Sequence, residues 1–224
     1  MTVLKKYVLL SMVMLWAAGG AHANGVEEIF IRAGLVDVHQ MDETIQVDLV
    51  NSDPRKNYFR EDFYSGLKTA YLQKEVAAKL AKAQDGLKRR HSEYSLLILD
   101  AARPRSVSKR MYDKMKGTRF EKFVANPARG SMHNYGIAVD ITIVDGRGKE
   151  LDMGFTPFRK SRLELCAMFA MKKLGKKLSP RQRDNRKLLA DVMTGAGFLP
   201  LSFEWWHFNG MPKSEARARY HIIE

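Results

Sequence analysis

Two short apolar runs constrain the fold of this chain most strongly. Tyr94–Leu99 (YSLLIL) is almost wholly apolar, which predicts a buried strand that Pro104 ends shortly afterwards. In 137–144 (IAVDITIV) every second residue is Ile or Val, which predicts a strand with one strongly apolar face. The Asp145-Gly146 that follows predicts a turn. One face of this second strand carries Ile137, Val139, Ile141 and Ile143, and the other carries Ala138, Asp140 and Thr142.

Helical patterns flank these strands. Apolar residues recur at helical spacing over 72–87, which predicts an amphipathic helix of about five turns. A second helix is expected between Pro104 and Gly117. Ser179-Pro180-Arg181-Gln182 fits a capping box that opens a third helix, which ends at Gly195 or Gly197. Helices and short strands in mixed order indicate one α+β domain.

Residues 1–23 have the pattern of an export signal. Lys5 and Lys6 precede an apolar run over 8–18, and Ala21-His22-Ala23 fits a cleavage site. That run is shorter than the ~20 residues of a membrane-spanning helix, and no later segment is long and apolar enough to span. We therefore expect removal of 1–23 and export of the domain 24–224 to the periplasm, without a transmembrane segment.

The formal net charge of +13 is concentrated in one segment. Residues 159–187 contain eleven Lys and Arg against Glu164 and Asp184, which predicts contact with an anionic cell envelope. Nucleic acid is not an expected partner, because the segment lacks a recognition motif and the chain carries an export signal. The single cysteine, Cys166, excludes an internal disulfide framework and a multi-cysteine zinc cluster.

Two segments carry candidate metal ligands. His133 lies just before the turn-prone 134–136 (NYG), and Asp140 lies on the strand that follows. A separation of seven residues would place the two on opposite faces of a continuous strand, whereas a turn lets the imidazole fold back over Asp140. His207 ends the run Glu204-Trp205-Trp206-His207. Two imidazoles and one carboxylate form a normal ligand set for catalytic zinc, with water in the fourth position.

The residues alone leave other interpretations open. A histidine beside aromatic residues is often a packing residue, and Asp140 could be a turn cap or a hydrogen-bonded carboxylate. His221 also remains an alternative ligand. With zinc present, a second carboxylate near the metal can take the proton of the water and pass it to the leaving amine.

The pattern Ser-x-His-x-x-Gly-x-Ala-x-Asp at 131–140, followed by Glu-Trp-Trp-His at 204–207, resembles the zinc D-alanyl-D-alanine dipeptidases. These are the vancomycin-resistance type among the D,D-peptidases, in peptidase family M15. The resemblance runs from about Asp48 to His207. It includes Tyr71-Leu72, Asp100-Ala-Ala-Arg-Pro, Asn126-Pro127 and Leu151-Asp-Met-Gly. It implies a single α+β domain whose small, mostly antiparallel sheet is flanked by helices, with a zinc site in a central cleft.

Residue by residue, the resemblance implies one Zn²⁺ per chain, held by His133, Asp140 and His207. Glu204 matches the general base, and Arg103 matches the arginine that stabilises the oxyanion. Ser131 matches a hydroxyl that lines the substrate site. The implied reaction is hydrolysis of D-Ala-D-Ala by a zinc-activated water.

One segment departs from the family pattern. Relatives follow Asp-Met-Gly with Thr-Pro-Phe-Asp, whose acid helps to hold the free amino group of a dipeptide. Here 152–160 reads DMGFTPFRK, with one residue inserted and Arg159 where the acid is expected. A cation cannot pair with an ammonium group. A D,D-carboxypeptidase-like activity on longer peptidoglycan stem peptides is therefore an alternative, as is a zinc-containing module that binds the cell envelope.

Overall fold

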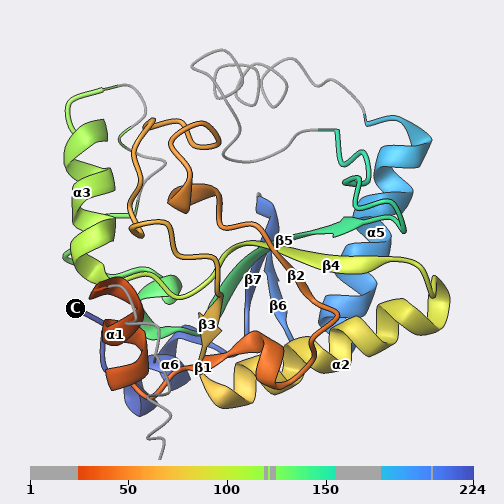
Figure 1. The fold of residues 1–224 in the computed structure, drawn as a ribbon, viewed down its shortest axis with the longest axis horizontal. Helices are drawn as coiled ribbons and strands as arrows, with labels where there is room; N and C mark the ends of the chain where they lie inside the picture. Colours follow the sequence, from red (N-terminus) through yellow and green to blue (C-terminus); the bar gives the residue numbers. More distant parts are fainter. Residues whose placement is uncertain (1–24, 119–120, 122–124, 155–177, 203) are drawn as a thin grey trace, which may run out of the picture.

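The computed structural model of the chain describes residues 25–118, 121, 125–154, 178–202 and 204–224 (Figure 1). The expected signal at 1–23, Cys166 and residues 159–177 of the basic segment lie outside this part. In chain order the elements are α1 (Gly25–Arg32), β1 (Val36–Asp37), η1 (Val38–Gln40), β2 (Gln46–Val47), η2 (Val50–Ser52), β3 (Tyr71–Leu72), α2 (Lys74–Arg90), β4 (Ser95–Asp100), α3 (Arg105–Met115), η4 (Met132–Tyr135), β5 (Ala138–Val144), α5 (Pro180–Gly195), β6 (Leu199–Leu201), β7 (Glu204–Asn209) and α6 (Lys213–Arg219). No helix in the described part is both long and apolar enough to cross a membrane.

A five-stranded sheet forms the centre of the fold, in the order β2-β4-β5-β7-β6. Strands β2 and β4 run parallel, and the other neighbours in this sheet are antiparallel. Strands β1 and β3 form a separate antiparallel pair. The predicted α+β class, with a mostly antiparallel sheet flanked by helices, is therefore confirmed.

Most of the predicted elements lie within two residues of their expected bounds. The helix expected from residue 72 begins at Lys74 instead, because Leu72 pairs with Val36 as part of β3. The capping box of α5 is present, with the hydroxyl of Ser179 accepting a hydrogen bond from the backbone N–H of Gln182 at 3.2 Å. Local sequence patterns thus set these boundaries, except where a tertiary strand pairing competes with helix propensity.

The two faces of the sheet have different roles. One face carries Ile98, Ile141 and Phe208, which belong to the main hydrophobic core with the buried sides of α2 and α5. The opposite face carries a small cluster of Val50, Leu97, Leu99 and Val144. In Figure 1, α2 and α5 lie along the first face, and the segment after β2 passes over the second. Asp140 lies on this second face, because it follows the same alternation as Thr142 and Val144.

A register shift in β4 changes the direction of one side chain. Ile98 lies opposite Ile141, but the next pair is Asp100 with Asp140, so the ladder slips by one residue between Ile98 and Asp100. Such a bulge can re-aim a side chain next to an active site. Without it, Leu99 would lie opposite Asp140. With it, the fully buried Asp100 lies on the same face as Asp140.

Candidate metal centre and active site

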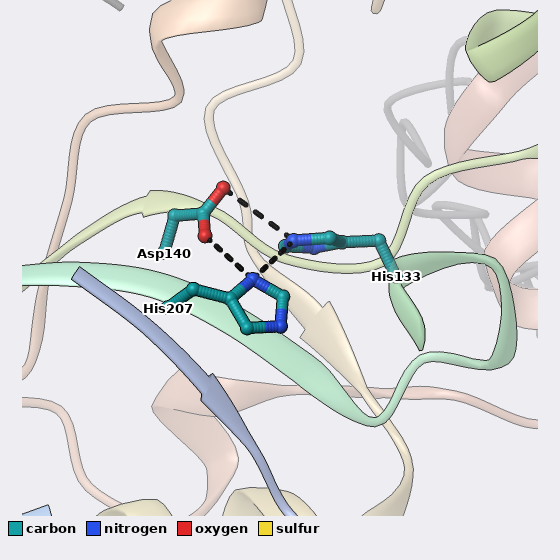
Figure 2. Close-up of side chains that lie close together, drawn as sticks. All are labelled: His133, Asp140 and His207. Carbon is teal, nitrogen blue, oxygen red and sulfur yellow. Dashed lines mark hydrogen bonds and ion pairs between the residues drawn. The ribbon is translucent and has the colours of Figure 1, made fainter. Parts of the chain in front are cut away.

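His133, Asp140 and His207 converge at one buried point on the second face of the sheet (Figure 2). The Nε2 atom of His133 lies 3.4 Å from Oδ2 of Asp140, and Nδ1 of His207 lies 3.0 Å from Oδ1. The two imidazole nitrogens are 3.3 Å apart. The structure therefore brings together the three residues that the resemblance implies as ligands. His221, the alternative ligand, is exposed and is not part of this cluster.

A short turn positions His133. Ser131 caps the 3₁₀ helix η4: its hydroxyl accepts from the N–H of His133 at 3.3 Å, and its own N–H donates to Oδ1 of Asn134 at 2.7 Å. Gly136 ends the turn in the left-handed conformation, with φ of 67°. The chain then enters β5, which carries Asp140. The turn expected at 134–136 is present, and Ser131 has a structural role in it.

A side chain at position 136 would also collide with a neighbouring residue. A Cβ added at this residue would lie 2.8 Å from the side chain of Leu35, closer than real contacts allow. We predict that Gly136→Ala lowers the free energy of unfolding by at least the ~1–2 kcal/mol cost of the left-handed conformation. Urea unfolding measures this loss. Gly148→Ala is the control for the steric part, because Gly148 has a similar φ and no atom within 4 Å of the added Cβ. Equal losses in the two variants would contradict a role for the Leu35 contact.

Strand pairing positions His207. Asp140 and His207 are directly opposite each other in the antiparallel pair β5–β7, so their side chains leave the same face as close neighbours. Ala138 pairs with Asn209 in the same ladder. Asn209 follows His207 by two residues and therefore lies on the same face.

Each imidazole is oriented through its second nitrogen. Nδ1 of His133 donates to the carbonyl oxygen of Ala101 at 2.7 Å, and Nε2 of His207 donates to Oδ1 of Asn209 at 3.0 Å. In neutral rings, the lone pairs of the two other nitrogens then point towards the carboxylate of Asp140. When both rings are neutral, three electron-rich groups face one another within 3.4 Å, with no proton between them. This arrangement fits a bound cation, and a nitrogen and carboxylate ligand set with outer hydrogen bonds suits zinc.

The ionised state of Asp140 is consistent with a role as a metal ligand. Burial alone would raise the pKa of Asp140, but hydrogen bonds and charge interactions with His133 and His207 outweigh it and lower this pKa strongly. Burial opposes protonation of His207, yet the carboxylate of Asp140 raises the pKa of that ring, so the proton that this favours must leave when a cation binds. Asp140 is therefore ionised throughout the physiological pH range, as a metal ligand must be.

Asn209 was not among the residues identified from the sequence. We predict that Asn209→Ala weakens zinc binding by about 10- to 100-fold, because the ring of His207 loses the partner that orients it. Asn209→Asp keeps an acceptor at this position and should retain most of the affinity. Competition with a chelator of known zinc affinity gives both values. Unchanged zinc affinity in Asn209→Ala would show that Asn209 does not orient the ligand.

Glu204 is the first residue of β7 and is half-buried near the cluster. In a regular strand, a separation of three would place it on the face opposite to His207. The pairing of β6 and β7 is irregular here, with a register shift between Pro200 and Leu201. Burial raises the pKa of Glu204, and the charges that act on it come from His207, Asp140, His133 and Arg103. The four groups that the resemblance implies for ligation and oxyanion binding are thus its electrostatic neighbours.

Arg103 is held by a buried network. It forms an ion pair with Asp100, to which its Nε also donates at 3.1 Å. Asp100 accepts two further hydrogen bonds, from the hydroxyl of Tyr64 at 2.7 Å and from Nδ2 of Asn51 at 3.1 Å. Burial opposes the charge on Arg103, but the neighbouring charge of Asp100 outweighs it and raises the pKa of the guanidinium. Arg103 is therefore a fixed cation beside the cluster.

The main chain joins Arg103 to the ligand turn. The N–H of Arg103 donates to the carbonyl oxygen of His133 at 3.0 Å, and Nδ2 of Asn134 donates to the carbonyl oxygen of Arg103 at 2.8 Å. The same segment provides the Ala101 carbonyl that orients His133. The run Asp100-Ala-Ala-Arg-Pro thus organises both the imidazole and the guanidinium.

The position that departs from the family pattern, Arg159, lies outside the described residues. The segment just before it is anchored to α5. Asp152 accepts from Nε2 of Gln182 at 3.1 Å, and Nε of Arg186 donates to the carbonyl oxygen of Met153 at 2.7 Å. The guanidinium of Arg186 also lies over the ring of Trp205, 5.2 Å from its centroid. One cation of the basic segment is therefore used in internal packing.

An α+β domain with a buried His/Asp/His cluster, a neighbouring glutamate and a fixed arginine has the parts of a metal-dependent hydrolase site. Sequence comparison specifies the family. Residues 32–222 match the model of the family Peptidase_M15, described as D-ala-D-ala dipeptidase. The chain belongs to this family, as the motifs at 131–140 and 204–207 indicated.

Two curated relatives are named D-alanyl-D-alanine dipeptidase. The chain is 33% identical to a D-alanyl-D-alanine dipeptidase of Escherichia coli (strain K12) over 117 residues, which cover 52% of this chain and 55% of the relative. It is 27% identical to a D-alanyl-D-alanine dipeptidase of Synechocystis sp. (strain ATCC 27184 / PCC 6803 / Kazusa), with coverage of 65% and 71% respectively. The match thus spans just over half the length of the Escherichia coli protein. Among solved structures, the LD-carboxypeptidase LdcB is similar with a TM-score of 0.39 and 21% identity, covering 66% of this chain and 63% of LdcB.

Proposed function

We propose that this chain is a zinc-dependent D,D-dipeptidase that hydrolyses D-Ala-D-Ala. The observation that carries the proposal is the convergence of His133, Asp140 and His207, whose free lone pairs face one point in the interior. Membership of the Peptidase_M15 family and the names of the two relatives support the substrate.

The residues divide the chemistry among them. Bound zinc would supply Lewis-acid chemistry, which lowers the pKa of a coordinated water to about 7. Glu204 accepts a proton from the attacking water and returns it to the amine that leaves as the C–N bond breaks. Its raised pKa favours this exchange, because a carboxyl group closer to neutrality both accepts and releases a proton readily.

Arg103 stabilises the negative charge that develops on the carbonyl oxygen. Its side chain is largely buried, and Asp100 fixes its direction, so the guanidinium needs little reorganisation during the reaction. Ser131, which caps the ligand turn, lies two residues before His133, where its hydroxyl can also contact the substrate. Export of the domain to the periplasm remains part of the proposal and rests on the pattern at 1–23.

The experiment that tests this function is product analysis on the zinc-loaded protein. D-Ala-D-Ala should yield two molecules of D-alanine, and L-Ala-L-Ala should be left uncut. Hydrolysis of an N-acylated D-Ala-D-Ala peptide at a rate far above that of the free dipeptide would favour the carboxypeptidase-like alternative. This alternative is suggested by the positively charged Arg159, which stands where relatives carry an acid. Binding to cell-envelope fragments without hydrolysis of either substrate would favour a binding module and contradict the proposal.

A further inference from the structure

Residues 220–224 form a segment that is distant from the ligand turn in sequence but reaches it in space. The segment follows α6, and the backbone of Tyr220 is extended, with φ of −128° and ψ of 145°. The hydroxyl of Tyr220 donates to the carboxylate of Glu75 in α2. At the other end, Glu224 forms an ion pair with Arg105 of α3. The segment is therefore held at both ends.

Ile223 contacts both chain segments that carry active-site groups. Its N–H donates to the carbonyl oxygen of Asn134 at 2.8 Å, and its own carbonyl oxygen accepts from the N–H of Arg105 at 2.7 Å. Asn134 directly follows His133 of the metal cluster. Arg105 lies two residues after Arg103. The main chain of one residue thus bridges the ligand turn and the arginine segment.

The side chain of Asn134 makes a second connection between these segments. It is fully buried, and its Nδ2 donates to the carbonyl oxygen of Arg103 at 2.8 Å and to the hydroxyl of Ser108 in α3 at 2.9 Å. Its Oδ1 accepts from the N–H of Ser131 at 2.7 Å. A buried amide with three partners is restrained to one orientation, because any other would leave polar atoms without partners. Asn134 therefore joins the ligand turn to Arg103 and α3.

The segment 220–224 makes its close contacts on the side of the ligand turn. Ile223 is 4% exposed, and Cδ1 of Ile222 lies 3.2 Å from the position that a Cβ at Gly130 would take. On another side the segment borders a cavity of about 550 Å³, which it shares with α1. Side-chain packing from the direction of α1 is therefore incomplete. The main-chain hydrogen bonds of Ile223 are the direct link between this segment and the site.

We propose that Asn134 is a positioning residue, locked by the main chain of Ile223, which keeps Arg103 at a fixed distance from the metal cluster. The inference rests on the proposed function, because it assumes that Arg103 stabilises an oxyanion that forms beside the cluster. A misplacement of 1 Å in an active site can cost about 10²-fold in rate. The cost should fall on kcat, because the contact with Arg103 strengthens only as the oxyanion forms.

Asn134→Ala tests this role in the zinc-loaded, full-length protein. It removes the three side-chain hydrogen bonds and leaves all three clustered ligands in place. We expect kcat for D-Ala-D-Ala to fall about tenfold, with KM changed less than about twofold and one zinc retained per chain. In the double variant Asn134→Ala/Arg103→Lys, kcat should stay within about twofold of that of Arg103→Lys, because both changes disturb the same contact. Losses that multiply, or loss of zinc, would overturn the proposal.

Ile223→Pro tests the lock from the other side, because proline has no N–H to donate to Asn134. We expect kcat to fall about fivefold with little change in KM. His221→Pro is the matched control and should keep wild-type kcat. His221 is exposed, its N–H donates to no group in the part of the chain described, and the extended backbone of Tyr220 suits a following proline. An equal fall in both variants would overturn the role of Ile223.

Amide hydrogen exchange provides a measurement that does not depend on hydrolysis. The N–H of Arg103, which donates to the carbonyl oxygen of His133, should exchange at least about tenfold faster in Asn134→Ala than in wild type. The N–H of Leu96, which donates to Gln84 near the start of β4, is the reference and should keep its rate. Unchanged exchange at Arg103 would overturn the positioning role and leave the proposed function intact. The expected exchange in a wild-type protein that cleaves no D-Ala-D-Ala would support the lock and overturn the proposed function.

Discussion

Replacement of Glu204 by Gln is expected to lower kcat for D-Ala-D-Ala hydrolysis by about 10³-fold, within the range for loss of a general acid–base group. Glutamine has nearly the same shape but cannot accept and return a proton. Zinc content should stay at one ion per chain, because Glu204 is not one of the three clustered ligands. Steady-state kinetics and metal analysis on the same preparation measure both quantities.

The comparison with a surface carboxylate makes this result specific. Glu43→Gln removes the same charge at an exposed residue and should keep wild-type activity. A Glu204→Gln enzyme with more than a tenth of wild-type kcat would contradict the assignment of the base. Loss of zinc together with activity would instead place Glu204 among the ligands, contrary to the cluster in Figure 2.

Replacement of Arg103 by Lys is expected to lower kcat/KM by about 10²-fold, as for removal of one oxyanion donor. Lysine keeps the positive charge but lacks the planar guanidinium with its several N–H donors. The guanidinium of Arg103 can donate to Asp100 with one edge and to a reacting oxygen with another. The loss should appear mainly in kcat, because the interaction strengthens only as the oxyanion forms. An Arg103→Lys enzyme with at least half of wild-type kcat/KM would contradict this role.

Asp100→Asn separates positioning from direct contact. Removal of one partner of a buried ion pair costs about 3–5 kcal/mol of stability and leaves Arg103 without its restraint. If Asp100 acts through Arg103, the double variant Asp100→Asn/Arg103→Lys should lose no more kcat than Arg103→Lys alone. Independent losses that multiply would show that the two residues act separately.

The elements that position the site could largely be predicted, because their signals are local. Alternation along 137–144 places Asp140 on one face of β5, and the turn-prone 134–136 allows His133 to approach it. Both signals act within a few residues of the side chains concerned. The predicted boundaries of α3, α5 and β4 agree with the structure for the same reason.

The partners of the site residues could not be predicted, because they come from distant pairing. Tyr64 and Asn51 reach Asp100 across 36 and 49 residues of chain. The face that Asp100 occupies depends on a one-residue slip between β4 and β5, which no pattern within β4 reveals. Asn209 did have a local signal, since a residue two positions after His207 must share its face of the strand.

Zinc content of the purified protein tests the central claim most directly. After dialysis against metal-free buffer, the account predicts about one zinc per wild-type chain by elemental analysis, and less than a tenth of that in His207→Ala. Reconstitution with zinc should restore D-Ala-D-Ala hydrolysis to metal-depleted wild type but not to His207→Ala. A wild-type protein that cleaves D-Ala-D-Ala at full rate without bound metal, or a His207→Ala protein that binds zinc as tightly as wild type, would contradict it.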